Sequence, residues 1–216
     1  MAILTISRKL GSNGNKIAKA VAEKLGYRLI DKDFIGAVLE EYGLVEFDRE
    51  YDHLPSIWER LDLEKKDRRE VLVDMINRVV RAVAKMDNMV ILGRSGYLIL
   101  NEYANVLHVR IHAPISHRAA QIAAEKGISV EEAEKITTQS DKVRADFVKT
   151  FYGVDWEATR SFDFVINREK IPAEFVINNL VKATRYIEEK DLDPATITAS
   201  IEEDATLHKA ILEQFE

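Results

Sequence analysis

Residues 3–16 of the chain read ILTISRKLGSNGNK, and this stretch decides the fold. A short apolar strand runs into a turn rich in Gly, Ser and Asn, and apolar residues then recur at helical spacing. Such a turn directs backbone N–H groups and the positive end of a helix at one point. Gly11 and Gly14 can adopt positive φ and let the main chain approach an anion closely. The stretch therefore predicts a phosphate-binding loop, although an ordinary β–α turn can have the same composition.

The composition indicates one globular domain without membrane contact. Of the 216 residues, 46% are hydrophobic and 31% are charged, which is enough for a substantial core. No apolar run has the length of a bilayer span and no signal-peptide pattern opens the chain, so we expect a cytoplasmic protein. The absence of Cys excludes disulfides, thiolate zinc sites and cysteine nucleophiles. A net charge of −6 argues against a nucleic-acid-binding protein, so local clusters of Arg and Lys must capture any anion.

Five apolar runs with helical stretches between them predict a parallel sheet. The runs cover residues 2–6, 27–30, 89–92, 106–111 and 164–166. Their continuous apolarity indicates that helices cover both faces, which gives a three-layer α/β domain. Ligands of such sheets bind at the carboxyl ends of the strands, so the residues directly after each run are candidates for the site.

A long insertion separates the second and third runs. It opens with a polar stretch over residues 46–53, continues through Pro55 and Trp58, and ends in an amphipathic helix. The apolar stripe of this helix consists of Val71, Leu72, Met75, Ile76, Val79, Val80 and Val83. Two interpretations stay open, a small subdomain that covers the substrate and a crossover helix with a long lead-in.

Three more helices are predicted in the second half of the chain. Ser129 and Glu132 form a capping box that starts a highly charged helix. After the fifth run, Phe175, Val176, Leu180, Val181, Ala183, Thr184 and Ile187 form the apolar face of a closing helix. The tail then carries Ile197, Ile201, Leu207, Ile211 and Leu212. We expect this tail to form a helix that docks on the domain or mediates a homodimer.

Several charged residues occupy positions where they could bind phosphate. Arg94 follows the third run, where its planar fork suits two phosphate oxygens, although strand-end arginines also form structural ion pairs. Arg118 lies one turn into the helix after the fourth run. Asp141 and Arg144 lie on the charged helix beyond it, where a charge run is also typical of a solvated face. Asp31 closes the second run and could hold a magnesium-bound water, orient a substrate hydroxyl or cap the next helix.

In their order along the chain, these motifs resemble the cytidylate kinase-like family, a branch of the P-loop nucleoside monophosphate kinases. The resemblance covers about residues 2–186 and rests on TISR (5–8), GSNG (11–14), AEKLG (22–26), DK (31–32), GR (93–94), Arg118 and DKVRA (141–145). It implies a three-layer P-loop kinase fold with a parallel five-stranded sheet over residues 1–190. An insertion that binds the monophosphate would span about 36–86 and a helical lid about 115–160, and residues 191–216 would form a C-terminal helical extension.

The resemblance also implies a reaction and roles for the candidate residues. ATP with Mg²⁺ would phosphorylate a nucleoside monophosphate or a similar small phosphorylated acceptor. Donor binding would fall to Arg8, Gly11, Ser12, Asn13, Gly14, Asn15 and Lys16, catalysis to Lys16, Arg118, Asp141 and Arg144, and acceptor binding to Asp31 and Arg94.

The loop departs from the usual G-x-x-x-x-G-K-[ST] pattern, because Gly14 stands where the pattern has its lysine. Either Lys16 or Arg8 could supply the missing charge. After Asp31, where cytidylate kinases have Ser and Arg, this chain has Lys32 and Asp33. Because phosphoryl transfer depends on positive charge around the transferred group, these departures favour a second hypothesis. In it the chain is a nucleotide-binding regulatory or sensor protein with a degenerate P-loop and little kinase activity.

Overall fold

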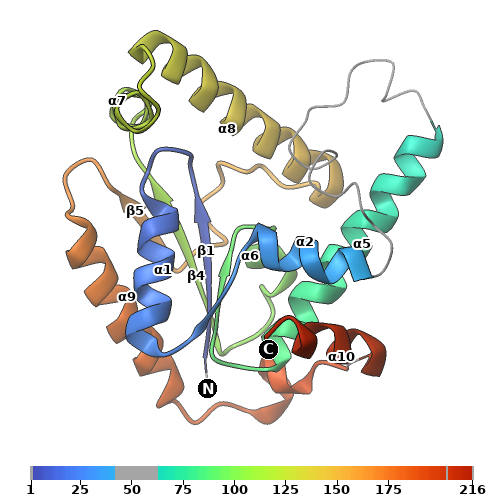
Figure 1. Cartoon of the computed structure of the whole chain (residues 1–216). Helices are drawn as coiled ribbons and strands as arrows, with labels where there is room; N and C mark the ends of the chain where they lie inside the picture. The colour runs from blue at the N-terminus through green and yellow to red at the C-terminus, as the bar shows by residue number, and fades with distance from the viewer. Residues whose placement is uncertain (1, 42–62, 203, 216) are drawn as a thin grey trace.

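The computed structural model describes residues 2–41, 63–202 and 204–215 and contains the predicted parallel sheet. Its strands are β1 (Ile3–Arg8), β2 (Arg28–Ile30), β3 (Met89–Leu92), β4 (Val106–His112) and β5 (Phe164–Asn167). They lie in the order β2-β3-β1-β4-β5, and every pairing is parallel. β1 is therefore the central strand, and the loop that follows it opens at the middle of the carboxyl edge (Figure 1).

Helices cover both faces of the sheet, which confirms the three-layer prediction (Figure 1). One face is covered by α1 (Gly14–Leu25) and α9 (Ala173–Glu188), and the other by α2 (Lys32–Glu41), α5 (Leu63–Lys85), α6 (Gly96–Ile99) and α10 (Ala205–Glu213). Successive side chains of a strand point to opposite faces, so Ile3 and Ile91 enter one core cluster while Leu4 and Val90 enter the other. The two faces therefore have separate hydrophobic cores.

Two further helices, α7 (Ile115–Lys126) and α8 (Val130–Tyr152), pack on each other beyond the carboxyl ends of the strands (Figure 1). The predicted capping box starts α8, since the Ser129 side chain accepts a hydrogen bond from the Glu132 backbone N–H at 3.1 Å. Among the helices of the described ranges, none is long and apolar enough to cross a bilayer.

The predicted continuous burial is wrong for the fifth strand. β5 forms an edge of the sheet and pairs only with β4. Its residues Phe164 and Val165 are 39% and 42% exposed, and Phe175 on the neighbouring α9 is 60% exposed. Val71, which was assigned to the apolar stripe of α5, is also a surface residue. Apolar type alone does not distinguish a central strand from an edge, because neighbouring strands decide what is covered.

The insertion is only partly described. The polar stretch 46–53, Pro55 and Trp58 lie outside the described residues. On one side of the gap α2 starts at Lys32, so the expected start of the insertion at residue 36 falls within this helix. On the other side α5 buries most of its predicted stripe against the sheet, through Leu72, Ile76, Val79, Val80 and Val83.

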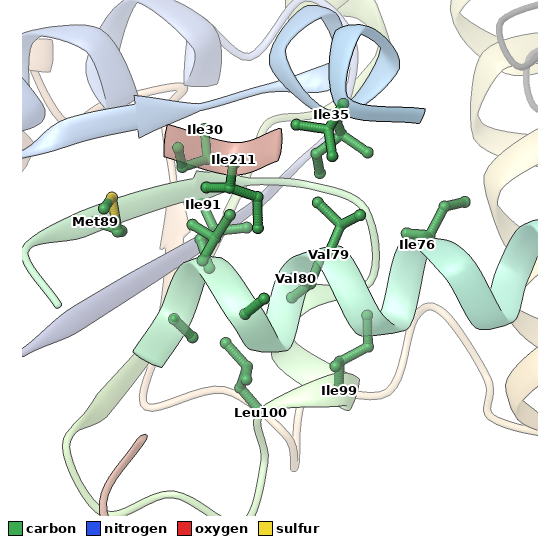
Figure 2. Close-up of a cluster of buried hydrophobic side chains, with 14 of the residues drawn as sticks. Ile30, Ile35, Ile76, Val79, Val80, Met89, Ile91, Ile99, Leu100 and Ile211 are labelled. Carbon is green, nitrogen blue, oxygen red and sulfur yellow. The ribbon is translucent and has the colours of Figure 1, made fainter. Parts of the chain in front are cut away.

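The C-terminal extension folds back onto its own domain. Two short 3₁₀ turns, η1 (Pro194–Thr196) and η2 (Thr198–Ser200), lead into α10. Asn105 holds this connection, since its amide donates to the Thr198 hydroxyl at 2.8 Å and accepts from the Thr198 N–H at 2.9 Å. Ile211 lies in the same core cluster as Ile30 of β2 (Figure 2). The buried apolar residues of the extension pack within one chain. A homodimer formed through the extension stays a prediction.

One histidine is part of the sheet interior. His108 of β4 lies beside Thr5 of β1, and the Thr5 hydroxyl is 2.7 Å from His108 Nδ1. The His108 backbone N–H donates to an Asp163 carboxylate oxygen at 2.7 Å. Burial lowers the pKa of the His108 imidazole below its ordinary value of 6.5, although Asp163 acts in the opposite direction. These contacts indicate a structural role for His108.

The buried His108 predicts a loss of stability in mild acid. Below about pH 6.5 the unfolded chain binds a proton at this imidazole while the folded chain resists it, so the free energy of unfolding decreases as pH falls. A single such group contributes at most about 1.4 kcal/mol per pH unit. We expect His108→Gln to show a shallower decline between about pH 6.5 and 5 than the wild type, measured by urea unfolding. Identical slopes for the two proteins would contradict this prediction.

Candidate phosphate-binding site

The loop between β1 and α1 takes its shape from two left-handed residues, Gly11 (φ 80°) and Asn13 (φ 61°). The positive φ that we expected at Gly14 is not found, because Gly14 is the first residue of α1. A glycine is required there for a different reason. A Cβ at residue 14 would lie 2.5 Å from the Cβ of Arg8, which is closer than real Cβ atoms approach. Close approach of the Arg8 side chain, rather than backbone twist, therefore selects this glycine.

Other loop residues fasten the loop to the rest of the domain. The Ser12 hydroxyl donates to the backbone oxygens of Lys9 (2.7 Å) and Ile111 (3.3 Å). A Cβ at Gly11 would lie 2.6 Å from the backbone oxygen of Arg118 on α7. Ser12 and Gly11 thus hold the loop against β4 and α7, so its backbone N–H groups are arranged before any ligand arrives.

Arg8 and Lys16 could each replace the missing loop lysine. Only Arg8 of the two lines the cavity between the loop, the end of β3 and α8. Its Nε donates to Asn15 Oδ1 at 2.9 Å, and its guanidinium lies against Gly93 at the end of β3. Lys16 instead forms an ion pair with Glu125 of α7 at 2.8 Å, and its side chain is 73% exposed. Lys16 does not occur in the described lining of the cavity.

A cavity of about 680 Å³ opens between the loop, the end of β3 and α8. Its described lining includes five positively charged residues, namely Arg8, Lys32, Arg94, Lys135 and Arg144. No Asp or Glu occurs among these described lining residues. Tyr97, Phe147 and Trp156 add aromatic surface. Such a cavity suits a ligand that combines phosphate groups with a planar apolar ring.

Arg94 enters this cavity from a tightly turned segment. Three consecutive residues, Gly93, Arg94 and Ser95, have φ values of 79°, 50° and 54°. Left-handed backbone is unfavourable for side chains other than glycine, and it is concentrated at functional sites. The turn leaves Arg94 only 8% exposed while it lines the cavity.

Arg118 and Asp141, predicted as catalytic residues, form an ion pair in which Arg118 is buried and Asp141 is partly exposed. Arg118 donates to the two carboxylate oxygens of Asp141 at 3.2 and 2.7 Å, to the Ala113 oxygen at 2.9 Å and to the Leu10 oxygen at 3.1 Å. Lys9 Nζ lies 3.6 Å from the same carboxylate. Arg118 is 3% exposed and does not line the cavity. The pair joins the loop, the end of β4 and α8, and a catalytic role for it stays a prediction.

Arg144 is the predicted catalytic residue that lines the cavity. It lies on α8, where its Nη1 donates to the Ser140 backbone oxygen at 3.0 Å and to the Ser140 hydroxyl. Lys135 lines the cavity from the same helix and was not singled out in the sequence. The two residues present positive charge from α8 toward the loop.

Asp31 caps α2, which is one of the alternatives considered for it. Its Oδ1 accepts from the backbone N–H groups of Asp33 (3.0 Å) and Phe34 (3.2 Å). The cavity does not support its predicted role in acceptor binding. The described lining includes the next residue, Lys32, but not Asp31. The cap instead fixes the first turn of α2, and with it the start of the Lys32 side chain.

Trp156 and Arg110 were missed in the sequence. Trp156 lines the cavity, and the Arg110 guanidinium lies 4.4 Å from the centre of its ring. Arg110 also donates to the Trp156 backbone oxygen, and Arg110 Nη2 lies 3.4 Å from Glu157 Oε2. Burial lowers the pKa of the Arg110 guanidinium, although Glu157 acts in the opposite direction. A charged residue within an otherwise apolar strand was the available signal for Arg110.

Comparison with known proteins agrees with this geometry. A model of the cytidylate kinase-like family matches residues 3–170. The cytidylate kinase of Ignicoccus hospitalis is 30% identical over 182 residues, which cover 83% of this chain and 97% of that protein. The cytidylate kinase of Archaeoglobus fulgidus is 29% identical over 188 residues, which cover 83% and 93% of the two chains.

A solved structure has a similar fold. The crystal structure of an uncharacterized protein from Eubacterium ventriosum covers 88% of this chain and 100% of its own, with a TM-score of 0.66 and 18% identity. The family match extends from β1 through the loop and α8 to the end of β5. The chain therefore belongs to the cytidylate kinase-like family and has the P-loop kinase fold of that family.

Proposed function

We propose that this protein transfers a phosphoryl group from ATP to a nucleoside monophosphate. The observation that carries the proposal is the cavity at the carboxyl edge of the sheet, whose described lining is cationic and free of carboxylates. Phosphoryl transfer requires little covalent participation by the protein and depends on positioning and on charge around the phosphates. Relatives named cytidylate kinases match most of the chain, which favours a nucleotide acceptor. An enzyme that consumes ATP in this way would act in the cytoplasm.

The donor phosphates belong at the loop in this proposal. The backbone N–H groups at the start of α1 and the positive end of that helix would hold them. Arg8, which crosses Gly14, would supply the charge that the usual loop lysine provides. Arg144 and Lys135 would add charge from α8, and the α7–α8 hairpin would act as the lid.

The acceptor belongs at the end of β3. Arg94 and Lys32 would hold its phosphate, since both line the cavity on the side of β3 and α2. Tyr97 and Phe147 offer aromatic surface to a base. The insertion between β2 and β3 would complete this half of the site.

The described residues do not fit a magnesium ion held by the protein. Mg²⁺ in kinases is bound by one or two carboxylates together with substrate phosphates. One oxygen of Asp31 caps α2, and both oxygens of Asp141 accept hydrogen bonds from Arg118. Over the described ranges no cluster of three His, Asp or Glu is arranged for a metal. We therefore assign no residue to Mg²⁺, which would enter on the phosphates of ATP.

A nucleotide sensor with little turnover is the second candidate, and two contacts favour it. Lys16 pairs with Glu125 rather than facing the cavity, and Arg118 pairs with Asp141. Both residues would contribute charge to the transferred group in an active kinase of this type. With those charges engaged elsewhere, nucleotide binding could persist while transfer is slow.

Substitution of Arg144 separates the two functions. Charge develops on the moving phosphoryl group only in the transition state, so Arg144→Ala should lower kcat on the order of 10²-fold while ATP affinity changes little. Rates with ATP, Mg²⁺ and a panel of nucleoside monophosphates measure this effect, and Lys149→Ala, exposed on the same helix, is the control. ATP binding without phosphorylation of any monophosphate by the wild type would favour the sensor.

Gly14→Val tests the loop. The new side chain would overlap Arg8, so we expect ATP affinity to fall at least about 100-fold in a folded protein, by calorimetry. Lys19→Val is the control, because it adds the same side chain to an exposed position of α1 outside the loop. Retained ATP affinity in Gly14→Val would reject the assignment of the donor site.

A comparison of Arg8→Ala with Lys16→Ala identifies the loop cation. Charge-assisted hydrogen bonds contribute about 1.5–3 kcal/mol, so loss of Arg8 should weaken ATP about tenfold or more. The loss should be smaller for AMP, which carries fewer phosphates. Lys16→Ala should have the weaker effect, because its ammonium pairs with Glu125. The reverse order of the two variants would return the role to Lys16.

A further inference from the structure

The C-terminal helix packs against the helix that begins at the acceptor side of the cavity. α10 contacts α2 and α5, and its residues Leu207 and Ile211 are buried in one cluster with Ile35 and Leu39 of α2. Figure 2 shows Ile211 and Ile35 in this cluster. The extension therefore forms part of the surface on which α2 rests.

The last contact of the extension is aromatic and reaches the first turn of α2. The ring of Phe215 stacks on Phe34, with ring centres 4.9 Å apart. On the strand before α2, the Arg28 guanidinium lies 3.9 Å from the centre of the same Phe215 ring. Phe215 thus contacts both the start of β2 and the start of α2, which enclose the turn at Asp31.

The first turn of α2 links this contact to the cavity. Lys32, its first residue, lines the cavity, and Phe34 lies two residues further on. The Asp31 carboxylate binds the N–H groups of Asp33 and Phe34, so this turn moves as one unit. Displacement of Phe34 would therefore displace the backbone from which the Lys32 side chain starts.

We propose that the C-terminal extension positions the acceptor half of the site, with Phe215 as the positioning residue. Phe215 holds the first turn of α2 where Lys32 reaches the phosphate of a nucleoside monophosphate. This inference rests on the proposed function. The family match ends at residue 170, so α10 and Phe215 lie outside it.

The donor half packs in a different core. α1, which follows the phosphate-binding loop, belongs to the cluster on the opposite face of the sheet from α10. A change at Phe215 should therefore reach the acceptor before the donor. This difference separates positioning of the acceptor from general loss of structure.

The kinetic test compares Phe215→Ala with Phe215→Leu, which restores part of the apolar contact, and with Leu212→Ala, an exposed position near the end of α10. We expect Phe215→Ala to raise the KM for the monophosphate about tenfold and leave the KM for ATP nearly unchanged, because small misplacements of a binding group cost up to about 10²-fold. Phe215→Leu should be intermediate and Leu212→Ala normal. Equal increases in both KM values would overturn the proposal.

A second measurement separates failure of this inference from failure of the kinase proposal. Hydrogen exchange of the ligand-free protein should rise in α2 but not in α1 for Phe215→Ala, and calorimetry with cytidine and adenosine monophosphates should show weaker binding. If these changes occur while the wild type phosphorylates neither compound, positioning stands and the kinase proposal fails. Unchanged exchange in α2, or unchanged monophosphate affinity, overturns positioning even in an active kinase. Absence of monophosphate binding by the wild type overturns both.

Discussion

The buried guanidinium of Arg118 is the interaction on which the arrangement of the site depends. It bonds to the phosphate-binding loop at Leu10, to the end of β4 at Ala113 and to α8 at Asp141. A charge this deeply buried is tolerable only when its donors are paired, so each of these elements must keep its place. Loss of one partner of such a pair typically costs about 3–5 kcal/mol. Arg118 therefore links the loop, the end of β4 and α8 at the carboxyl edge of the sheet.

The charged residues near the loop, α7 and α8 form two groups, one at Asp141 and one that lines the cavity. Asp141 pairs with Arg118 and with Lys9, Lys9 also pairs with Glu157 at 2.7 Å, and none of these residues lies in the described cavity lining. Arg8 and Arg144 line the cavity, whose described lining contains no Asp or Glu. An anionic ligand can therefore bind these two side chains without breaking the ion pair between Arg118 and Asp141.

The two halves of the proposed reaction also rest on different cores. The loop and α1 pack on one face of the sheet, while α2, α5 and α10 pack on the other. Both halves meet only at the carboxyl edge, where the cavity lies. A chain that lacks the usual loop lysine thus keeps a cationic site by bringing Arg8 from the strand, Arg94 from a strained turn and Lys32 from a capped helix.

Sequence alone predicted the parallel sheet, the loop after β1 and Arg94 at a strand end, because strand apolarity, glycine spacing and strand ends are local signals, whereas Arg144 was predicted from the family resemblance. Tertiary structure decided the rest. Arg8 reaches the cavity by lying against Gly93, which is far away in sequence, and the pairing of Arg118 with Asp141 requires α7 and α8 to pack. The burial of Ile211 likewise depends on α2 and α5, since an amphipathic helix can cover its own domain or another chain equally well until its partner surface exists.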